Sequence, residues 1–247
     1  MATFTEIKHQ WIKFQGMATS KINTDGLFSP ISVDEPTAPE DELHFLKLVS
    51  WTYILFVECF PILYKQIGST IRVSDAATFK RINEIQQNIQ ALRTFQGHNL
   101  LANSASDQRK ISLVTIWRQN YGGSPIIWSN CCTALCDQTI EILKYLEVAI
   151  SKIFMDQEDA SQFNNDLRFT VERNWEPHEF DRIVDDAAKE IGIEGIDVVK
   201  YRDSRIKIWR DTVSLFSVRA EANIAVSRSI KEELNQKFGE VKNEKKN

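Results

Sequence analysis

The stretch that decides the fold is residues 75–97, Asp-Ala-Ala-Thr-Phe-Lys-Arg-Ile-Asn-Glu-Ile-Gln-Gln-Asn-Ile-Gln-Ala-Leu-Arg-Thr-Phe-Gln-Gly. Its large apolar residues recur at intervals of three or four positions, at Phe79, Ile82, Ile85, Ile89 and Leu92. This spacing predicts an α-helix with one apolar face. Ser74 or Asp75 is suited to cap its start and Gly97 to end it.

The same periodicity continues on both sides of this stretch. It predicts helices over residues 43–66, 108–119, 126–155, 160–173, 178–191 and 203–238. We expect Pro61 to bend the first of them, because proline cannot donate a hydrogen bond within a helix. The last one carries a near-heptad apolar seam suited to packing against a neighbouring helix or a second subunit. Since no useful run alternates with a period of two, the predicted class is all-α, a bundle of long helices.

Composition agrees with this class and excludes others. The 247 residues include only nine glycines and six prolines, too few for the many turns of a sandwich or barrel. The formal net charge of −4 excludes a strongly basic nucleic-acid coat. A local basic pocket remains compatible with it, since net charge says nothing about how charges are distributed.

Three regions follow from the order of these patterns. Residues 1–42 read as an N-terminal arm or linker, since residues 26–42 hold three prolines and end in acidic residues. Residues 43–155 hold the predicted helical bundle. Residues 156–247 form a C-terminal helical region that ends in the long helix predicted over 203–238.

The chain carries no pattern for secretion or membrane insertion. The N-terminus lacks a basic segment followed by an apolar run. The most apolar stretch, residues 45–64, is interrupted by Lys47, Glu58 and Pro61, so we expect a buried helix rather than a membrane span. Four cysteines without a secretion signal indicate a cytoplasmic, reduced protein. Three of them, in Cys131-Cys132-x3-Cys136, lack a fourth zinc ligand and are interpreted as buried small side chains; we expect no metal and no cofactor.

The candidate chemistry rests on two of the four histidines. Both Arg93-Thr-Phe-Gln-Gly-His98 and Arg173-Asn-Trp-Glu-Pro-His178 have the spacing Arg-x4-His. Arginine offers a permanent charge and a planar fork for phosphate oxygens. Histidine can move a proton to or from a ribose hydroxyl. An arginine and a histidine held at one helix junction are therefore suited to metal-independent phosphodiester cleavage.

Arg93, His98 and their neighbours resemble the motif of the HEPN superfamily of helical ribonucleases. The resemblance rests on the phrase Leu-Arg-Thr-Phe-Gln-Gly-His-Asn-Leu, residues 92–100, within a predicted bundle spanning about residues 43–155. It implies a homodimer whose cleft pairs two such motifs, RNA as substrate, and cleavage that leaves a 2′,3′-cyclic phosphate. It also implies a role in phage defence or a toxin system, with an inhibitory or activating protein partner. Arg93 would bind the scissile phosphate and His98 would transfer the proton, with Thr94 and Asn99 orienting the substrate.

Alternatives remain open at this point. Arg173 and His178 are a secondary candidate pair. Because glutamates neighbour both residues, the pair is also interpreted as the salt-bridged start of a helix. Arg93 and Gly97 are also an ordinary helix ending, since a cation in the last turn favours the helix dipole. The chain would then be a catalytically silent helical adaptor, or a protein that senses RNA or a nucleotide without cutting it.

Overall fold

In the computed structural model, the described residues (2–24, 26–101, 103–216 and 218–238) form ten α-helices, one π-helical turn and no strand. The predicted all-α class is therefore confirmed. The chain divides into two compact units, unit 1 (Met1–Leu167) and unit 2 (Arg168–Asn247). The division falls inside helix α7 (Gln157–Arg173), so this helix contributes residues to both units.

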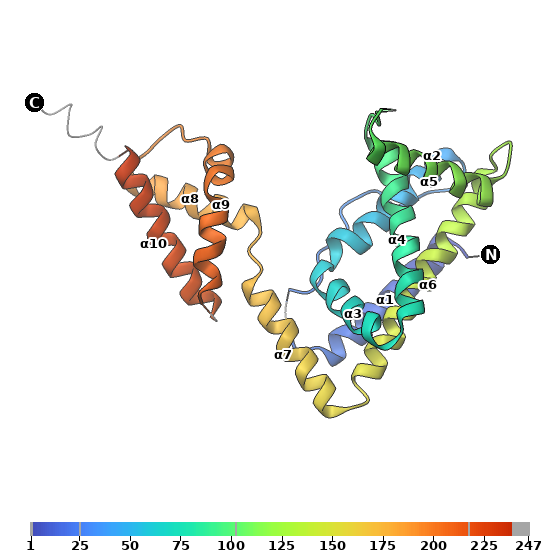
Figure 1. Cartoon of the computed structure of the whole chain (residues 1–247), viewed down its shortest axis with the longest axis horizontal. Helices are drawn as coiled ribbons and strands as arrows, with labels where there is room; N and C mark the ends of the chain where they lie inside the picture. Colours follow the sequence, from blue (N-terminus) through green and yellow to red (C-terminus); the bar gives the residue numbers. More distant parts are fainter. Residues whose placement is uncertain (1, 25, 102, 217, 239–247) are drawn as a thin grey trace, which may run out of the picture. The chain divides into compact units, whose positions relative to one another are not determined.

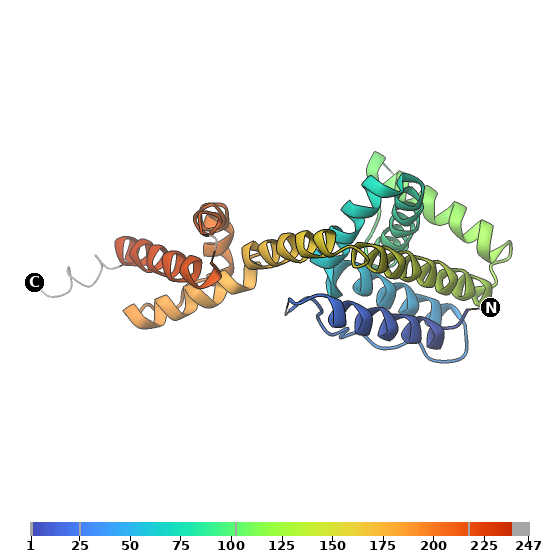
Figure 2. The ribbon, with the colours of Figure 1, turned by 90° about the horizontal axis from the view of Figure 1, so that it is seen from below.

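Unit 1 is built around one long central helix, α6 (Trp128–Ile153). Five other helices pack against it: α1 (Phe4–Lys21), α2 (Glu42–Ile54), α3 (Pro61–Ser74), α4 (Ala76–Gly97) and α5 (Ala105–Gly122). Figures 1 and 2 show α1 running beside α6 along most of its length.

The inner face of α6 is buried over its whole length and is mostly apolar. Its buried residues are Cys131, Cys132, Leu135, Cys136, Gln138, Thr139, Ile142, Leu143, Leu146, Ile150 and Ile153. The two polar members have partners: Trp117 Nε1 donates to Gln138 Oε1 at 3.2 Å, and Thr139 Oγ1 donates to the Leu135 carbonyl at 2.7 Å. Burying this stripe against five helices is the main source of stability for unit 1.

The helix predicted over 43–66 is bent at the predicted position. The chain first forms α2 and a π-helical turn, η1 (Leu55–Cys59). The next helix, α3, follows at an angle of 82° to them. Phe60 leaves the helical conformation with φ −145° and ψ 51°, and Pro61 begins α3 without needing a hydrogen-bond acceptor for its nitrogen. The chain thus changes direction between α2–η1 and α3, and both of these segments stay packed on the bundle.

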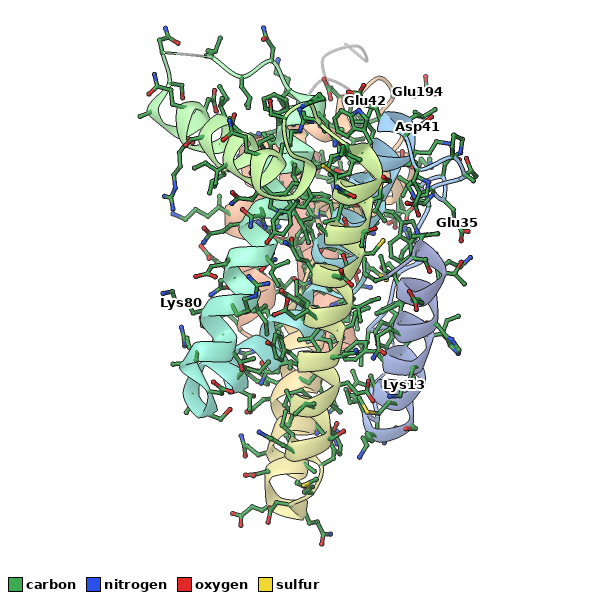
Figure 3. The ribbon with its side chains drawn as sticks, turned by 90° about the vertical axis from the view of Figure 1, so that its right-hand side faces the viewer. Lys13, Glu35, Asp41, Glu42, Lys80 and Glu194 are labelled. Atoms are coloured by element: carbon green, nitrogen blue, oxygen red, sulfur yellow. The ribbon has the colours of Figure 1, made fainter. Side chains whose placement is uncertain are left out.

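Residues 1–42 differ from the expected arm. Residues 4–21 form α1, which buries Ile7, Trp11, Phe14 and Ala18 in unit 1. These positions are four, three and four apart, which is a helical apolar face. Residues 26–41 contain no helix, yet they are held on the bundle by paired hydrogen bonds: Ser29 N–H donates to the Cys59 carbonyl and Cys59 Sγ donates to the Ser29 carbonyl. Figure 3 shows Glu35 in this segment and Lys13 on α1, on the side of α6 away from Lys80.

Unit 2 has its own core between α8 (Pro177–Ile191), α9 (Val198–Ser214) and α10 (Arg219–Phe238). Trp209 and Phe180 are fully buried at its centre. The long helix predicted over 203–238 is here two helices, α9 and α10. The break lets the two helices pack on each other, so that Trp209 and Val213 share one core with Val226 and Ile230. Of the two partners expected for this seam, a neighbouring helix or a second subunit, the structure shows the first, because helices of the same chain cover most of it.

Among the described residues, no single helix has both the length and the apolar character needed to cross a membrane; the segments Glu42–Cys59 and Pro61–Ser74 meet that test only when taken together across their 82° bend.

Two glycines of unit 1 give a matched test of this packing. A Cβ added at Gly122 would lie 2.7 Å from Cys131 Sγ and 3.1 Å from Ile126 Cγ2, whereas a Cβ at Gly16 would meet nothing within 4 Å. We expect Gly122→Ala to lower the free energy of unfolding by about 1–3 kcal/mol through overpacking. Gly16→Ala, on an exposed position of α1, should raise it by about 0.5–1 kcal/mol through helix propensity. Urea denaturation followed by circular dichroism measures both; equal midpoints for the two variants would contradict the packing described for α5 and α6.

Candidate functional site

Arg93 and His98 stand at the C-terminal end of α4, as predicted from residues 75–97. Asp75 caps the start of this helix by accepting from Thr78 N–H, and Gly97 is its last residue. His98 follows in extended conformation, with φ −131° and ψ 145°, and its N–H donates to the Thr94 carbonyl at 3.0 Å. Its side chain is exposed. The end of α4 thus presents the imidazole to solvent.

The Arg93 side chain folds over the last turn of α4. A Cβ added at Gly97 would collide with Arg93 Nη1, so the absence of a side chain at Gly97 makes room for the guanidinium. The same side chain lines a cavity of about 410 Å³ between α4, α2 and the segment before α2. The residues that line it are Val33, Asp34, Leu46, Lys47, Ser50, Arg93 and Gln96.

The charges in this cavity favour an anionic ligand. Within the described ranges, Arg93 has no carboxylate oxygen within 4.0 Å. Lys47 Nζ is 3.9 Å from Asp34 Oδ2, and the Asp34 side chain is 89% exposed, so solvent weakens this contact. Gln96 adds an amide nitrogen, Nε2, that is buried without a hydrogen-bond acceptor in the described structure. The cavity thus has two cations, Lys47 and Arg93, beside a single carboxylate, Asp34, a set suited to phosphate oxygens.

The other residues predicted for this site, Thr94, His98 and Asn99, do not line the cavity. Thr94 Oγ1 donates to the Gln90 carbonyl at 2.8 Å, within its own helix. Asn99 is exposed directly after His98. His98 itself is not among the residues that line the cavity, which holds Lys47, Ser50 and Gln96 around Arg93 instead.

Lys47, Ser50 and Gln96 line the cavity but are not among the site residues predicted from the sequence. Lys47 had a signal of its own, because it is a lone cation in the most apolar stretch of the chain. No feature of the sequence distinguishes Ser50 and Gln96 from other polar surface residues. Their place in the site depends on how α2 packs on α4, which the spacing of residues within one helix does not specify.

The secondary pair, Arg173 and His178, lies in unit 2. The Arg173 guanidinium stacks on the ring of Phe169, one turn earlier in α7, at 3.9 Å from the ring centroid. His178 is exposed in the first turn of α8, after the capping residue Glu176 and Pro177. Glu179, one of the glutamates considered as a partner for this pair, is ion-paired with Arg219. Arg173 is thus packed on its own helix, and neither residue of this pair lines the cavity beside Arg93.

All four cysteines are free and buried, which confirms the interpretation of Cys131, Cys132 and Cys136 as small core side chains. Burial raises the pKa of Cys59 to about 11 and that of Cys132 to about 12, and it also raises the pKa values of Cys131 and Cys136. Among the described residues, no group of three or more His, Cys, Asp or Glu side chains is arranged to hold a metal ion.

These thiols should be unreactive in the folded chain. With its pKa at about 11, Cys59 is a thiolate in roughly one molecule in a thousand at pH 8, and the thiolate is the nucleophile. We expect iodoacetamide to leave all four cysteines unmodified at pH 8 and to modify all four in 6 M guanidinium, read by intact mass. The rate on the folded chain should rise as pH increases, because the thiolate fraction rises. Rapid native labelling of any of the four would contradict the burial described.

No protein-family model, curated protein or solved structure matches the chain.

Proposed function

We propose that this protein is a metal-independent endoribonuclease of the HEPN type, which cuts RNA at a site formed by Arg93 and His98 from two copies of the chain. The observation that carries the proposal is the end of α4: an arginine without a carboxylate partner in the described structure, in a cavity with Lys47 and the unsatisfied amide of Gln96. An exposed imidazole follows within five residues. We place the activity in phage defence or a toxin system, on the resemblance of residues 92–100.

The chemistry follows from these two side chains. The ribose 2′-oxygen attacks the adjacent phosphorus, and the bond from phosphorus to the 5′-oxygen breaks, which leaves a 2′,3′-cyclic phosphate and a 5′-hydroxyl. One His98 imidazole takes the proton from the 2′-hydroxyl, and the imidazole of the second copy donates a proton to the departing 5′-oxygen. Arg93 stabilises the negative charge that builds on the phosphate oxygens.

The surface around the end of α4 supports pairing of two copies. Leu43 at the start of α2 is 61% exposed, and Leu101 after α4 is 56% exposed. Phe95 is 37% exposed beneath the guanidinium of Arg118. Exposed apolar side chains near a polar site are typical of surfaces that become covered on association.

One observation favours the second candidate, a helical adaptor without catalysis. The Arg93 guanidinium lies at the last turn of α4, where a cation is favourable because unpaired carbonyls give the helix end a partial negative charge. Arg93 would then stabilise the helix end alone. The two candidates differ in what removal of the imidazole does, since His98 contributes to cleavage only in the first.

Arg93→Ala and His98→Ala should each lower the rate of RNA cleavage at least about a hundredfold, because each removes a group that acts on the reacting atoms. Cleavage of a fluorescent single-stranded RNA measures this, with the 2′,3′-cyclic phosphate end identified by mass spectrometry. EDTA should have no effect. Matched controls are His9→Ala and Arg109→Ala, which remove an exposed histidine from α1 and an exposed arginine from α5. Unchanged cleavage by His98→Ala, with circular dichroism showing an intact fold, rules the assignment out.

A further inference from the structure

A second cavity lies on α4, where this helix faces α3 and the π-helical turn. Its volume is about 440 Å³. The residues that line it are Phe56, Val57, Pro61, Tyr64, Lys65, Gly68, Ser69, Arg72, Phe79, Asn83, Gln86 and Gln90. We refer to it as the α3–α4 groove.

The α3–α4 groove has cations and amides but no carboxylate among its lining residues. Lys65 and Arg72 are exposed, and neither makes an ion pair within the described part of the chain. They are seven residues apart on α3, which places them on one face and about 10 Å apart along its axis. Three amides, of Asn83, Gln86 and Gln90, contribute from α4. This set attracts an anion and offers donors and acceptors beside it.

The floor of the α3–α4 groove is apolar, and the side chains around it leave the groove unfilled. Phe56 is buried at the base, and Phe79 lies opposite Gly68, where an added Cβ would still be 3.9 Å from Phe79 Cε2. The Tyr64 hydroxyl donates to Gln86 Oε1 at 3.3 Å, and burial raises the pKa of Tyr64, so it stays a neutral phenol. A flat, partly apolar group such as a nucleobase fits between such walls.

The α3–α4 groove and Arg93 share one face of α4. Phe79, Gln86 and Arg93 are successive positions seven apart, which stay on one face of a helix. The distance along α4 from Phe79 to Arg93 is about 21 Å. On the other side, the continuous segment α2–η1–α3 contributes Lys47 to the Arg93 cavity and Lys65 to the groove. Four cations are therefore spread along this face of α4 rather than gathered at one point: Lys47, Lys65, Arg72 and Arg93.

We propose that the α3–α4 groove holds the single strand of RNA that continues from the scissile phosphate, with Lys65 and Arg72 binding its backbone phosphates. This inference rests on the proposed function, since it extends the same substrate beyond Arg93. Cations spaced along a helix match a strand with one charge per nucleotide better than a lone phosphate. The amides and the apolar floor contact bases, and they impose at most a modest sequence preference.

The test measures binding without cleavage, using a 2′-O-methyl oligonucleotide that lacks the attacking hydroxyl. Lys65→Ala/Arg72→Ala should weaken binding roughly tenfold in fluorescence anisotropy, and it should reduce the slope of log affinity against log salt by about 1.4, the value for two lost phosphate contacts on a single strand. The matched control, Arg109→Ala/Lys144→Ala, removes the same charge from exposed positions of α5 and α6. Equal affinity for the two double variants would overturn the proposal.

Gly68 gives a second variant pair that separates charge from size. Gly68→Glu places a carboxylate in the groove and should abolish binding of the oligonucleotide, whereas Gly68→Gln, of the same size, should weaken it less. Both remove a glycine from the interior of α3, so neither is expected to unfold it. Equal binding by both variants at wild-type affinity would show that the strand does not enter the groove.

The outcomes separate this inference from the proposed function. If His98→Ala stops cleavage while Lys65→Ala/Arg72→Ala binds like the wild type, the groove proposal fails and the nuclease proposal stands. If the wild-type chain does not cut RNA but the groove variants lose affinity, the nuclease proposal fails and strand binding in the groove stands.

Discussion

The site and the groove both depend on the 82° bend between α2–η1 and α3. If α2 and α3 formed one straight helix, that helix would diverge from α4 after a few turns. Because the segment is bent, α2 packs against α4 before the bend and α3 packs against α4 after it. Phe60 at the corner is fully buried and contacts the rings of Trp11, Phe14 and Phe28. The corner is therefore fixed by an aromatic cluster that joins α1 and the following segment to the bundle, and this explains why residues 4–41 belong to unit 1.

The distribution of charge, rather than its total, suits this face of unit 1 to RNA. The chain has a net charge of −4, yet Lys47, Lys65, Arg72 and Arg93 line two cavities that contain a single carboxylate, Asp34. Arg81 on the same helix α4 differs, because it makes two hydrogen bonds to Glu141 and lowers the pKa of that carboxyl. Under the proposed function, RNA would bind at this face, and the net negative charge would oppose a general affinity for nucleic acid.

Periodicity within the chain predicted most helices, because the pattern of three and four is local. Asp75, Gly97 and Pro61 correctly marked two helix boundaries and the bend. The helix α1 was missed although Trp11 and Phe14 lie on its apolar face, and the break after Ser214 was missed because it depends on packing between α9 and α10. The positions of Arg93 and His98 at the end of α4 followed from sequence, whereas Lys47 and Gln96 enter the site only through tertiary packing.

Under the proposed function, one cleavage site needs residues from two copies of the chain. Mixing wild-type protein with inactive His98→Ala protein, after subunit exchange, measures this directly. If both imidazoles of a pair are required, an equal mixture retains about a quarter of the wild-type activity per total chain, since only pairs of two wild-type copies cut RNA. If activity falls in simple proportion to the wild-type fraction, to about half, each copy acts on its own and the shared site does not exist.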